Sequence, residues 1–380
     1  MSLGNPVFAP RRRQVLACLA GGVVAALAAP AVLRAAPAPL RIEPVAAGLA
    51  EPWAIGFLPD GGFLITERDG RLRHFAAPGA EGRAVEGLPQ VAARGQGGLL
   101  DLCIPRDFAQ TAEILFSYAA PQGAGAGTAL AAARLDLPAG RLADLRVLFQ
   151  MPGSRAGQHF GGRIAELPDG TLALTIGDRG QRDLAQDLTR HNGKLLRFTR
   201  AGGIPPDAPF AGRDDALAEI HSYGHRNPQG MALDAEGALW LSEHGARGGD
   251  EVNRIRPGAN YGWPAITWGR DYSGAKIGTG TKAPGMEQPA HYWDPSIAPS
   301  GHAVCSGRMF PDWAGHHLIG SLKSDHIARL DPAAPGPGGW AQTRIATPET
   351  ARVRDLREAP DGAIWFLSVG QGAAFRITPG

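Results

Sequence analysis

A histidine stands beside two glycines in the segment His159-Phe-Gly-Gly-Arg. Imidazole has an ordinary pKa near neutrality, so it can accept a hydroxyl proton while a hydride leaves the carbon that carries the hydroxyl. His159 is therefore a candidate general base. A lone histidine more often serves as a structural hydrogen-bonding group, and its residue type alone leaves both interpretations open.

Cationic and amide side chains in other segments suit a ligand that carries carboxylates. Arg226 and Asn227 occupy a Gly-His-Arg-Asn-Pro-Gln-Gly segment, and Lys323, Arg352 and Arg354 lie towards the end of the chain. Side chains alternate along a strand, so Arg352 and Arg354 share a face and can clamp carboxylates if that face is turned inward. The alternatives are a structural salt bridge for Arg226 and a solvated charged edge for the later cations.

An acidic, glycine-rich segment, Ser242-Glu-His-Gly-Ala-Arg-Gly-Gly-Asp-Glu, has the composition of a calcium loop. Calcium takes six to eight oxygen ligands and mixes carboxylates with backbone carbonyls. A loop that ends in Asp250 and Glu251 can present both kinds of oxygen. An ordinary acidic turn is the alternative.

An internal repeat predicts the fold that must position these residues. The segment beginning at Trp53 (Trp-Ala-Ile-Gly-Phe-Leu-Pro-Asp-Gly-Gly-Phe-Leu-Ile-Thr-Glu) is echoed at Gly162, Gly230 and Val353. Each copy is a short alternating strand, a Pro-Asp-Gly-type turn and a second strand. Two degenerate copies, near positions 105 and 311, complete a set of six. The turns of the six copies lie near positions 59, 105, 168, 235, 311 and 360, roughly 45 to 75 residues apart. This spacing predicts an all-β, six-bladed β-propeller with four-stranded antiparallel blades rather than a β-sandwich.

Long segments between the repeats are expected to form the walls of a site at one mouth of the central channel. They cover residues 150–162, 179–209, 245–282 and 289–301, and they hold His, Arg, Asn, Trp and Tyr rather than low-complexity sequence. Loops of this length in a compact domain are usually functional or disordered.

The first 38 residues read as an export signal of the twin-arginine type, followed by one propeller domain over 39–380. Arg11, Arg12 and Arg13 precede an Ala/Gly/Val/Leu run, which favours export to the periplasm or secretion over a membrane anchor. Without the signal's four arginines the chain has 34 bases (38 − 4) against 36 acids, so its charge gives no reason to expect nucleic acid or an anionic membrane as partner. Cys103 and Cys305 either pair or remain small buried thiols.

Short segments in the same order along nearly the whole chain resemble the PQQ-dependent soluble aldose and glucose dehydrogenase family. Besides the segments above, Gly-Gln-Gly-Gly-Leu-Leu-Asp from Gly95, Asn-Tyr-Gly-Trp-Pro from Asn260, Leu322-Lys and Arg-Val-Arg-Asp from Arg352 carry the resemblance. The resemblance implies that His159 is the general base and contacts pyrroloquinoline quinone (PQQ). It also implies that PQQ is bound by Gln96, Arg226, Asn227, Tyr272, Lys323, Arg352 and Arg354.

The resemblance further implies two calcium sites. Successive carbonyls of Gly245 and Ala246 would hold the ion beside PQQ, and Ala246 replaces a proline that is frequent in the family. Glu251 and Tyr261 resemble ligands of a structural calcium in related aldose dehydrogenases.

We therefore expect an enzyme that oxidises aldose sugars at C1 to aldonolactones with PQQ and calcium, and passes electrons to an unidentified acceptor. The sequence leaves open whether the protein is a monomer or a homodimer. A Gly-x-Gly-x-x-Gly fingerprint in a βαβ unit is missing, which argues against a nicotinamide enzyme. The alternatives are a calcium-dependent lactonase, which would concentrate carboxylates rather than arginines, and a non-catalytic carbohydrate-binding propeller.

Overall fold

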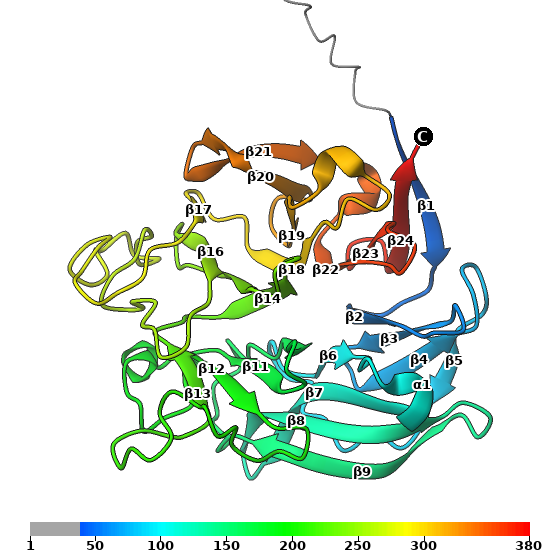
Figure 1. The fold of residues 1–380 in the computed structure, drawn as a ribbon, viewed down its shortest axis with the longest axis horizontal. Helices are drawn as coiled ribbons and strands as arrows, with labels where there is room; N and C mark the ends of the chain where they lie inside the picture. The colour runs from blue at the N-terminus through cyan, green and yellow to red at the C-terminus, as the bar shows by residue number, and fades with distance from the viewer. Residues whose placement is uncertain (1–38) are drawn as a thin grey trace, which may run out of the picture. The chain divides into compact units, whose positions relative to one another are not determined.

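The structure is a computed structural model, and it describes residues 39–380. The predicted export signal, residues 1–38, lies outside the described residues. Residues 39–380 form six four-stranded antiparallel sheets arranged around a central axis (Figure 1). The predicted six-bladed β-propeller is therefore confirmed.

Each blade runs from an inner strand at the axis to an outer strand at the rim. Blade 1 holds β2 (Pro52–Phe57), β3 (Phe63–Glu67), β4 (Arg71–Phe75) and β5 (Arg83–Val85); blade 2 holds β6 (Leu99–Cys103), β7 (Glu113–Gln122), β8 (Gly125–Asp136) and β9 (Arg141–Gln150); blade 3 holds β10 (Ile164–Glu166), β11 (Leu172–Ile176), β12 (Lys194–Phe198) and β13 (Ile220–Tyr223). Blade 4 holds β14 (Pro228–Leu233), β15 (Leu239–Glu243), β16 (Asp250–Arg254) and β17 (His291–Trp293); blade 5 holds β18 (Pro299–Val304), β19 (His317–Ser321), β20 (Ile327–Gly336) and β21 (Gly339–Ile345).

Blade 6 closes the ring with strands from both ends of the described chain. It holds β22 (Val353–Glu358), β23 (Ile364–Ser368), β24 (Ala373–Pro379) and, as its outer strand, β1 (Leu40–Ala46). Because β1 pairs with β24, the sheet ends are locked together without a free seam. The helices are short: α1 (Phe108–Thr111) and the 3₁₀ turns η1 (Arg182–Ala185), η2 (Pro311–Trp313) and η3 (Pro348–Thr350).

The predicted turns lie between the first and second strands of the six blades. In blade 1, the Asp60 carboxylate accepts a hydrogen bond from the Gly62 backbone at 2.9 Å, and Gly61 has φ +88°. Asp therefore closes the turn locally while Gly takes a backbone conformation that other residues avoid, which is why the Pro-Asp-Gly pattern marks the blades.

A hydrophobic cluster fills each interface between neighbouring blades. On β3, for example, Phe63 and Ile65 pack towards blade 6, and Leu64 between them packs towards blade 2. The alternation of a strand thus buries both of its faces, because every blade is covered on two sides. The inner strands of adjacent blades contact one another around the axis, and this contact positions their side chains in the channel.

The structure corrects the prediction of long loops in part, because three of the four segments contain strands. Residues 179–209 contain β12, 245–282 contain β16, and 289–301 contain β17 and the start of β18. The strands were missed because they are three to six residues long, and β16 is polar in sequence (Asp-Glu-Val-Asn-Arg) although Asp250, Val252 and Asn253 are buried.

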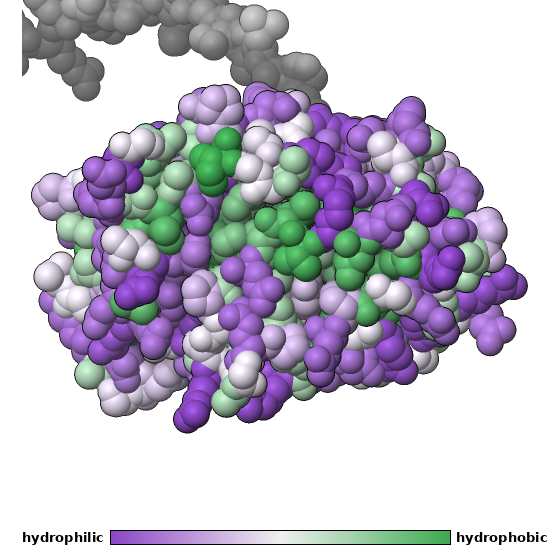
Figure 2. Space-filling view, turned by 90° about the horizontal axis from the view of Figure 1, so that it is seen from below, coloured by the Kyte–Doolittle hydropathy of each residue, from purple (hydrophilic) through white to green (hydrophobic). Residues whose placement is uncertain are grey.

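The rim of the propeller is mixed in polarity. Figure 2 shows hydrophobic groups gathered among hydrophilic ones across the face seen from below. On the outer strand β9, Leu145 and Val147 are exposed.

Within residues 39–380, none of the helices has the length and apolarity needed to cross a bilayer. Cys103 and Cys305 are both free thiols, so they do not form a disulfide.

Candidate active site

A cavity of about 250 Å³ lies on the propeller axis. All six blades contribute to its wall, mostly through inner strands and the segments that lead into them. Four residues predicted to bind the cofactor line it: Gln96, Asn227, Arg352 and Arg354. The repeat therefore brings together residues that are up to 258 positions apart (354 − 96) in the sequence.

The cavity wall carries an excess of positive charge. Its charged residues are Arg68, Arg352 and Arg354 against a single carboxylate, Glu51, which binds Arg68. Arg354 donates to the side-chain oxygen of Gln229 at 2.9 Å, a neutral partner. Burial, then the nearby cations, lowers the pKa of Arg354 to about 9. The wall is thus suited to an anionic ligand.

Arg352 lines the cavity, but not because of the regular strand alternation that was predicted. It has φ +52° and precedes β22, where the pairing with β23 shifts register between Val353 and Asp355. Its guanidinium donates to the Leu322 carbonyl at 3.1 Å. Arg352 and Arg354 therefore both line the cavity, but a bulge rather than a regular strand brings them together.

His159 is buried beside the cavity and is held by an aspartate. Its Nδ1 lies 2.6 Å from Oδ1 of Asp178, which also accepts from the Gly180 backbone at 2.7 Å. Burial alone would raise the pKa of Asp178, but the hydrogen bonds from His159 and Gly180 hold it below its ordinary value. An ionised carboxylate can only accept, so Nδ1 carries the proton and Nε2 is left as the basic nitrogen.

The backbone around His159 is shaped for this contact. His159 has φ +53°, and its N–H donates to the side-chain oxygen of Gln96 at 2.7 Å. A side chain at Gly177 would collide with the His159 carbonyl, so the glycine lets the two segments pack directly. Gln96 thus both lines the cavity and supports the histidine.

Arg226 lines a second, smaller cavity and contacts Tyr272, which does not line it. Arg226 lines this cavity of about 10 Å³, and its backbone N–H donates to Glu243 at 2.8 Å. Its guanidinium is 3.5 Å from the hydroxyl of Tyr272, which is 71% exposed. His244 lines both cavities, and burial, then Arg226, lowers its pKa to about 3.

Lys323 is exposed and does not line the main cavity, although Leu322 beside it does. Asn227 lines the cavity through a side chain whose oxygen accepts from the Gly161 backbone at 3.2 Å. The predicted cofactor residues are thus divided between the main cavity wall, its supporting layer and its surroundings.

The small cavity gathers oxygen atoms. Glu243, Gly245, Glu251 and Tyr261 line it, while Ala246 does not. Burial, then the neighbouring Glu243, raises the pKa of Glu251 to about 8. Two carboxylates packed together in a buried site favour a bound cation or a shared proton.

These residues fit a hard cation such as calcium. No cluster of three metal-binding side chains occurs within residues 39–380, so a cation here would combine the two carboxylates with backbone carbonyls. The hydroxyl of Tyr261 donates to the Arg254 carbonyl at 2.7 Å and accepts from the Arg256 backbone at 2.9 Å, which leaves its own carbonyl as the oxygen donor. The side-chain oxygen of Asn253, which bridges Glu243 and Glu251 through its amide group, has no partner.

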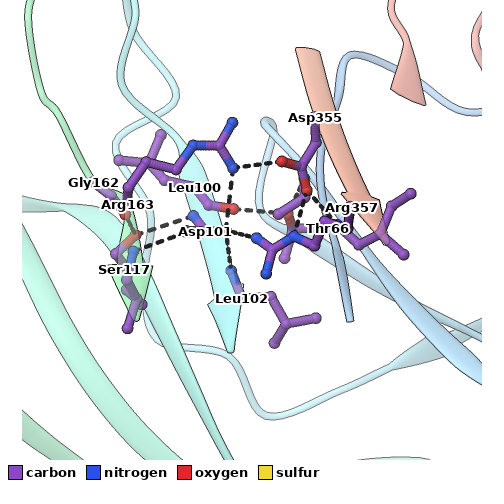
Figure 3. A network of polar contacts seen from close by, with 12 residues as sticks. Thr66, Leu100, Asp101, Leu102, Ser117, Gly162, Arg163, Asp355 and Arg357 are labelled. Carbon is purple, nitrogen blue, oxygen red and sulfur yellow. Dashed lines mark hydrogen bonds and ion pairs between the residues drawn. The ribbon is translucent and has the colours of Figure 1, made fainter. Parts of the chain in front are cut away.

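An ion network, which we call the floor, lies against the wall of the main cavity, because Arg163 donates to the backbone carbonyls of Gln229 and Arg354. Figure 3 shows the contacts within this network. Arg163 donates to Asp355 at 2.8 Å and to Asp101 at 3.3 Å, and Arg357 contacts the same two carboxylates. On the far side lies a further cavity of about 200 Å³, lined by Arg163, Asp101, Asp355, Arg357 and His302. The network therefore divides the channel into two chambers.

Several contacts of the site were not predicted from the sequence. Asp178 is 19 positions from His159, Gln229 is 125 positions from Arg354, and Arg68 comes from blade 1. Trp53 lies against both Arg163 and Arg354, with ring centres 4.2 and 5.6 Å from their guanidinium carbons. Only the fold brings these pairs together, although Asp178 lies two positions after β11, the second strand of the repeat copy that begins at Gly162.

Comparison with known proteins identifies the family. The profile of the family described as Glucose / Sorbosone dehydrogenase matches residues 49–376. The chain belongs to this family. It is 44% identical to Aldose sugar dehydrogenase YliI of Escherichia coli K12 over 354 residues, which cover 91% of this chain and 95% of that protein.

Solved structures of the glucose/sorbosone dehydrogenase family share the whole propeller. The apo-form soluble aldose sugar dehydrogenase from Escherichia coli aligns with a TM-score of 0.84 at 41% identity, covering 90% of this chain and 100% of that chain. The PQQ-bound aldose sugar dehydrogenase from Streptomyces coelicolor aligns with a TM-score of 0.75 at 25% identity, covering 90% and 99%. The predicted family and the prediction of an oxidoreductase are confirmed, against a lactonase or a non-catalytic propeller.

Proposed function

We propose that the protein oxidises aldose sugars at C1 to aldonolactones, with PQQ in the main cavity and calcium in the small one. The main support is the wall of the main cavity, which holds three arginines and one glutamate. Beside it lies His159, whose Nδ1 is held by Asp178. PQQ is a flat quinone with three carboxylates, so its charge complements this wall. The names of the relatives, which include a PQQ-bound aldose sugar dehydrogenase, support the same cofactor and substrate class.

We assign the proposed roles of the protein residues on the basis of their contacts. Nε2 of His159 takes the proton of the C1 hydroxyl, while Asp178 holds Nδ1–H and stabilises the resulting imidazolium. Arg352 and Arg354 bind cofactor carboxylates, and Gln96 and Asn227 orient the ligand through their amides. PQQ, when bound, supplies the hydride acceptor. Tyr272 and Lys323 would contact it from the exposed edge.

One calcium would be held by Glu251 and by the carbonyls of Gly245 and Tyr261, with Glu243 adding a second carboxylate, so the small cavity joins ligands that the resemblance assigned to two separate ions. Ala246, the other predicted carbonyl ligand, lies in the same loop, which is closed by a short bridge to Gly248. A cation there supplies positive charge next to Arg226 and relieves the repulsion between the two glutamates. The export prediction places this chemistry in the periplasm or outside the cell.

A reconstitution assay tests the proposal. Purified protein is mixed with PQQ and calcium, supplied with glucose and other aldoses, and followed by reduction of an artificial dye. We expect dye reduction that needs cofactor and sugar together, and His159→Ala is expected to keep PQQ bound yet lose most turnover. If no aldose reduces the dye and no quinone absorbance is retained, the proposed function is wrong.

A further inference from the structure

Trp263 is a buried side chain that contacts both Asp178, the carboxylate that holds His159, and the guanidinium of Arg226. It follows β16 in the long connection of blade 4, within the segment that begins at Asn260. Its backbone N–H donates to the Gly224 carbonyl at 2.8 Å, and its carbonyl accepts from the Gln186 side chain at 2.7 Å. These bonds tie the blade 4 connection to blade 3 and fix the place of the indole ring.

The edge of the indole reaches the carboxylate that holds His159. Nε1–H of Trp263 donates to Oδ2 of Asp178 at 2.8 Å, while Oδ1 of Asp178 faces Nδ1 of His159 at 2.6 Å. Both oxygens of this buried carboxylate are therefore engaged. A carboxylate held at both oxygens cannot rotate about its Cβ–Cγ bond without breaking a hydrogen bond, so the indole fixes the oxygen that faces the histidine.

The face of the same ring packs against Arg226. The guanidinium carbon lies 5.3 Å from the ring centre, within the range of a cation–π contact. Arg226 and Asp178 are also joined directly, because the Asp178 N–H donates to the Arg226 carbonyl at 2.8 Å. Trp263 also lines the small cavity together with Glu243 and Glu251.

We propose that Trp263 is a positioning residue for proton abstraction: its N–H fixes Asp178, and through it the imidazole of His159, while its ring fixes Arg226. The inference rests on the proposed dehydrogenase function and deepens it. It accounts for a buried indole N–H that donates to the carboxylate holding His159 rather than to the backbone.

Replacement by phenylalanine separates this role from packing. Trp263→Phe keeps an aromatic ring next to Arg226 but leaves Oδ2 of Asp178 without its donor. Trp268→Phe is the matched control, because Trp268 lies five positions later (268 − 263) and its indole N–H has no hydrogen-bond partner. Both variants lose the same atoms from the same loop.

In the reconstituted enzyme we expect Trp263→Phe to lower kcat by about 10- to 100-fold, which is at or below the lower end of the ~10²- to 10⁴-fold that a positioned general base supplies, because the base itself is kept. KM and the PQQ dissociation constant should stay within about 3-fold of wild type, because the residues that line the main cavity are untouched. In an Asp178→Asn background the same replacement should cost little more, since both changes act through one carboxylate. Trp268→Phe should behave as wild type.

A second readout needs no activity. The proton between His159 and Asp178 should give a downfield proton NMR signal in the cofactor-free protein, assigned by its loss in His159→Ala. We expect it to shift or vanish in Trp263→Phe and to persist in Trp268→Phe. If wild-type protein neither binds PQQ nor reduces dye, the proposed function fails, and the NMR comparison still decides the positioning role. An unchanged signal with unchanged kcat overturns that role, as does an equal loss of PQQ affinity, KM and thermal stability.

Discussion

The two chambers of the channel use arginine in opposite ways. On the floor, Arg163 and Arg357 share two buried carboxylates, Asp101 and Asp355. In the main cavity, Arg354 binds a neutral glutamine side chain instead. Charges that are neutralised in place hold the blades together, whereas charges left with neutral partners remain available to a ligand.

The pKa directions of the two arginines follow this division. Against the cost of burial, Asp355 and Asp101 raise the pKa of Arg357. Burial, Arg163 and Arg352 lower that of Arg354. Arginines therefore repel one another in the main cavity, whereas carboxylates neutralise them on the floor. Loss of a floor arginine should lower stability, and loss of a cavity arginine should weaken ligand binding.

The largest expected effect is a loss of stability on breaking the floor. Arg163→Met removes the cation shared by Asp101 and Asp355 and leaves buried carboxylates without a partner on one side. We expect the free energy of unfolding to fall by about 3–5 kcal/mol, measured by chemical denaturation. Arg344→Met, on the exposed part of β21, is the control and should change it by less than about 0.5 kcal/mol. A floor variant as stable as the control contradicts the comparison.

Arg354→Gln should show the reverse pattern. Loss of a charged hydrogen-bond donor, about 1.5–3 kcal/mol, weakens PQQ binding by about 10- to 150-fold. Stability of the cofactor-free protein should stay the same or rise, because the repulsion from Arg163 and Arg352 is relieved. Arg344→Gln carries the same charge change outside the site. If Arg354→Gln binds PQQ normally but is less stable, Arg354 has the stabilising role of the floor arginines and not a ligand-binding role.

Two buried histidines at the second chamber should make the stability of the protein sensitive to acid. Nε2 of His302, in its wall, lies 2.9 Å from Nδ1 of His317, and burial lowers the pKa of both, that of His317 to about 4. A folded-state pKa below the unfolded value of 6.5 means that the unfolded chain binds more protons between pH 6.5 and 4, so stability falls as pH falls through this range. We expect His317→Gln to remove on the order of 1–2 kcal/mol of that fall, measured by denaturation at several pH values. A fall of the same size in the variant would place the acid-sensitive groups elsewhere.

The smallest effect is expected for the exposed cation. Lys323→Gln should weaken PQQ binding by about 2- to 5-fold at low salt, and the difference should disappear at high salt, because exposed charges are screened. A salt-independent loss as large as that of Arg354→Gln would show that Lys323 becomes buried against the ligand.

The fold was predictable because one local signal repeats. Pro-Asp-Gly turns between alternating strands mark the blades without any knowledge of long-range contacts. Short strands inside the long segments were not predictable, since β16 owes its burial to neighbours rather than to apolar side chains.

The site was predictable only where its residues lie in recognisable segments. Arg352 and Arg354 both line the main cavity, but the bulge in β22 that brings them there has no signal in the sequence. Asp178 and Trp263, 85 positions apart, meet through the packing of blades 3 and 4, which residue spacing does not encode. The calcium and cofactor roles remain predictions.

Equilibrium binding of PQQ and of its trimethyl ester to the purified protein tests the central claim most directly. The ester keeps the flat quinone and loses the carboxylate charges. If the arginines of the main cavity are held available for an anionic ligand, PQQ should bind at least about 100-fold more tightly than the ester. Equal affinities for the two compounds would contradict the account.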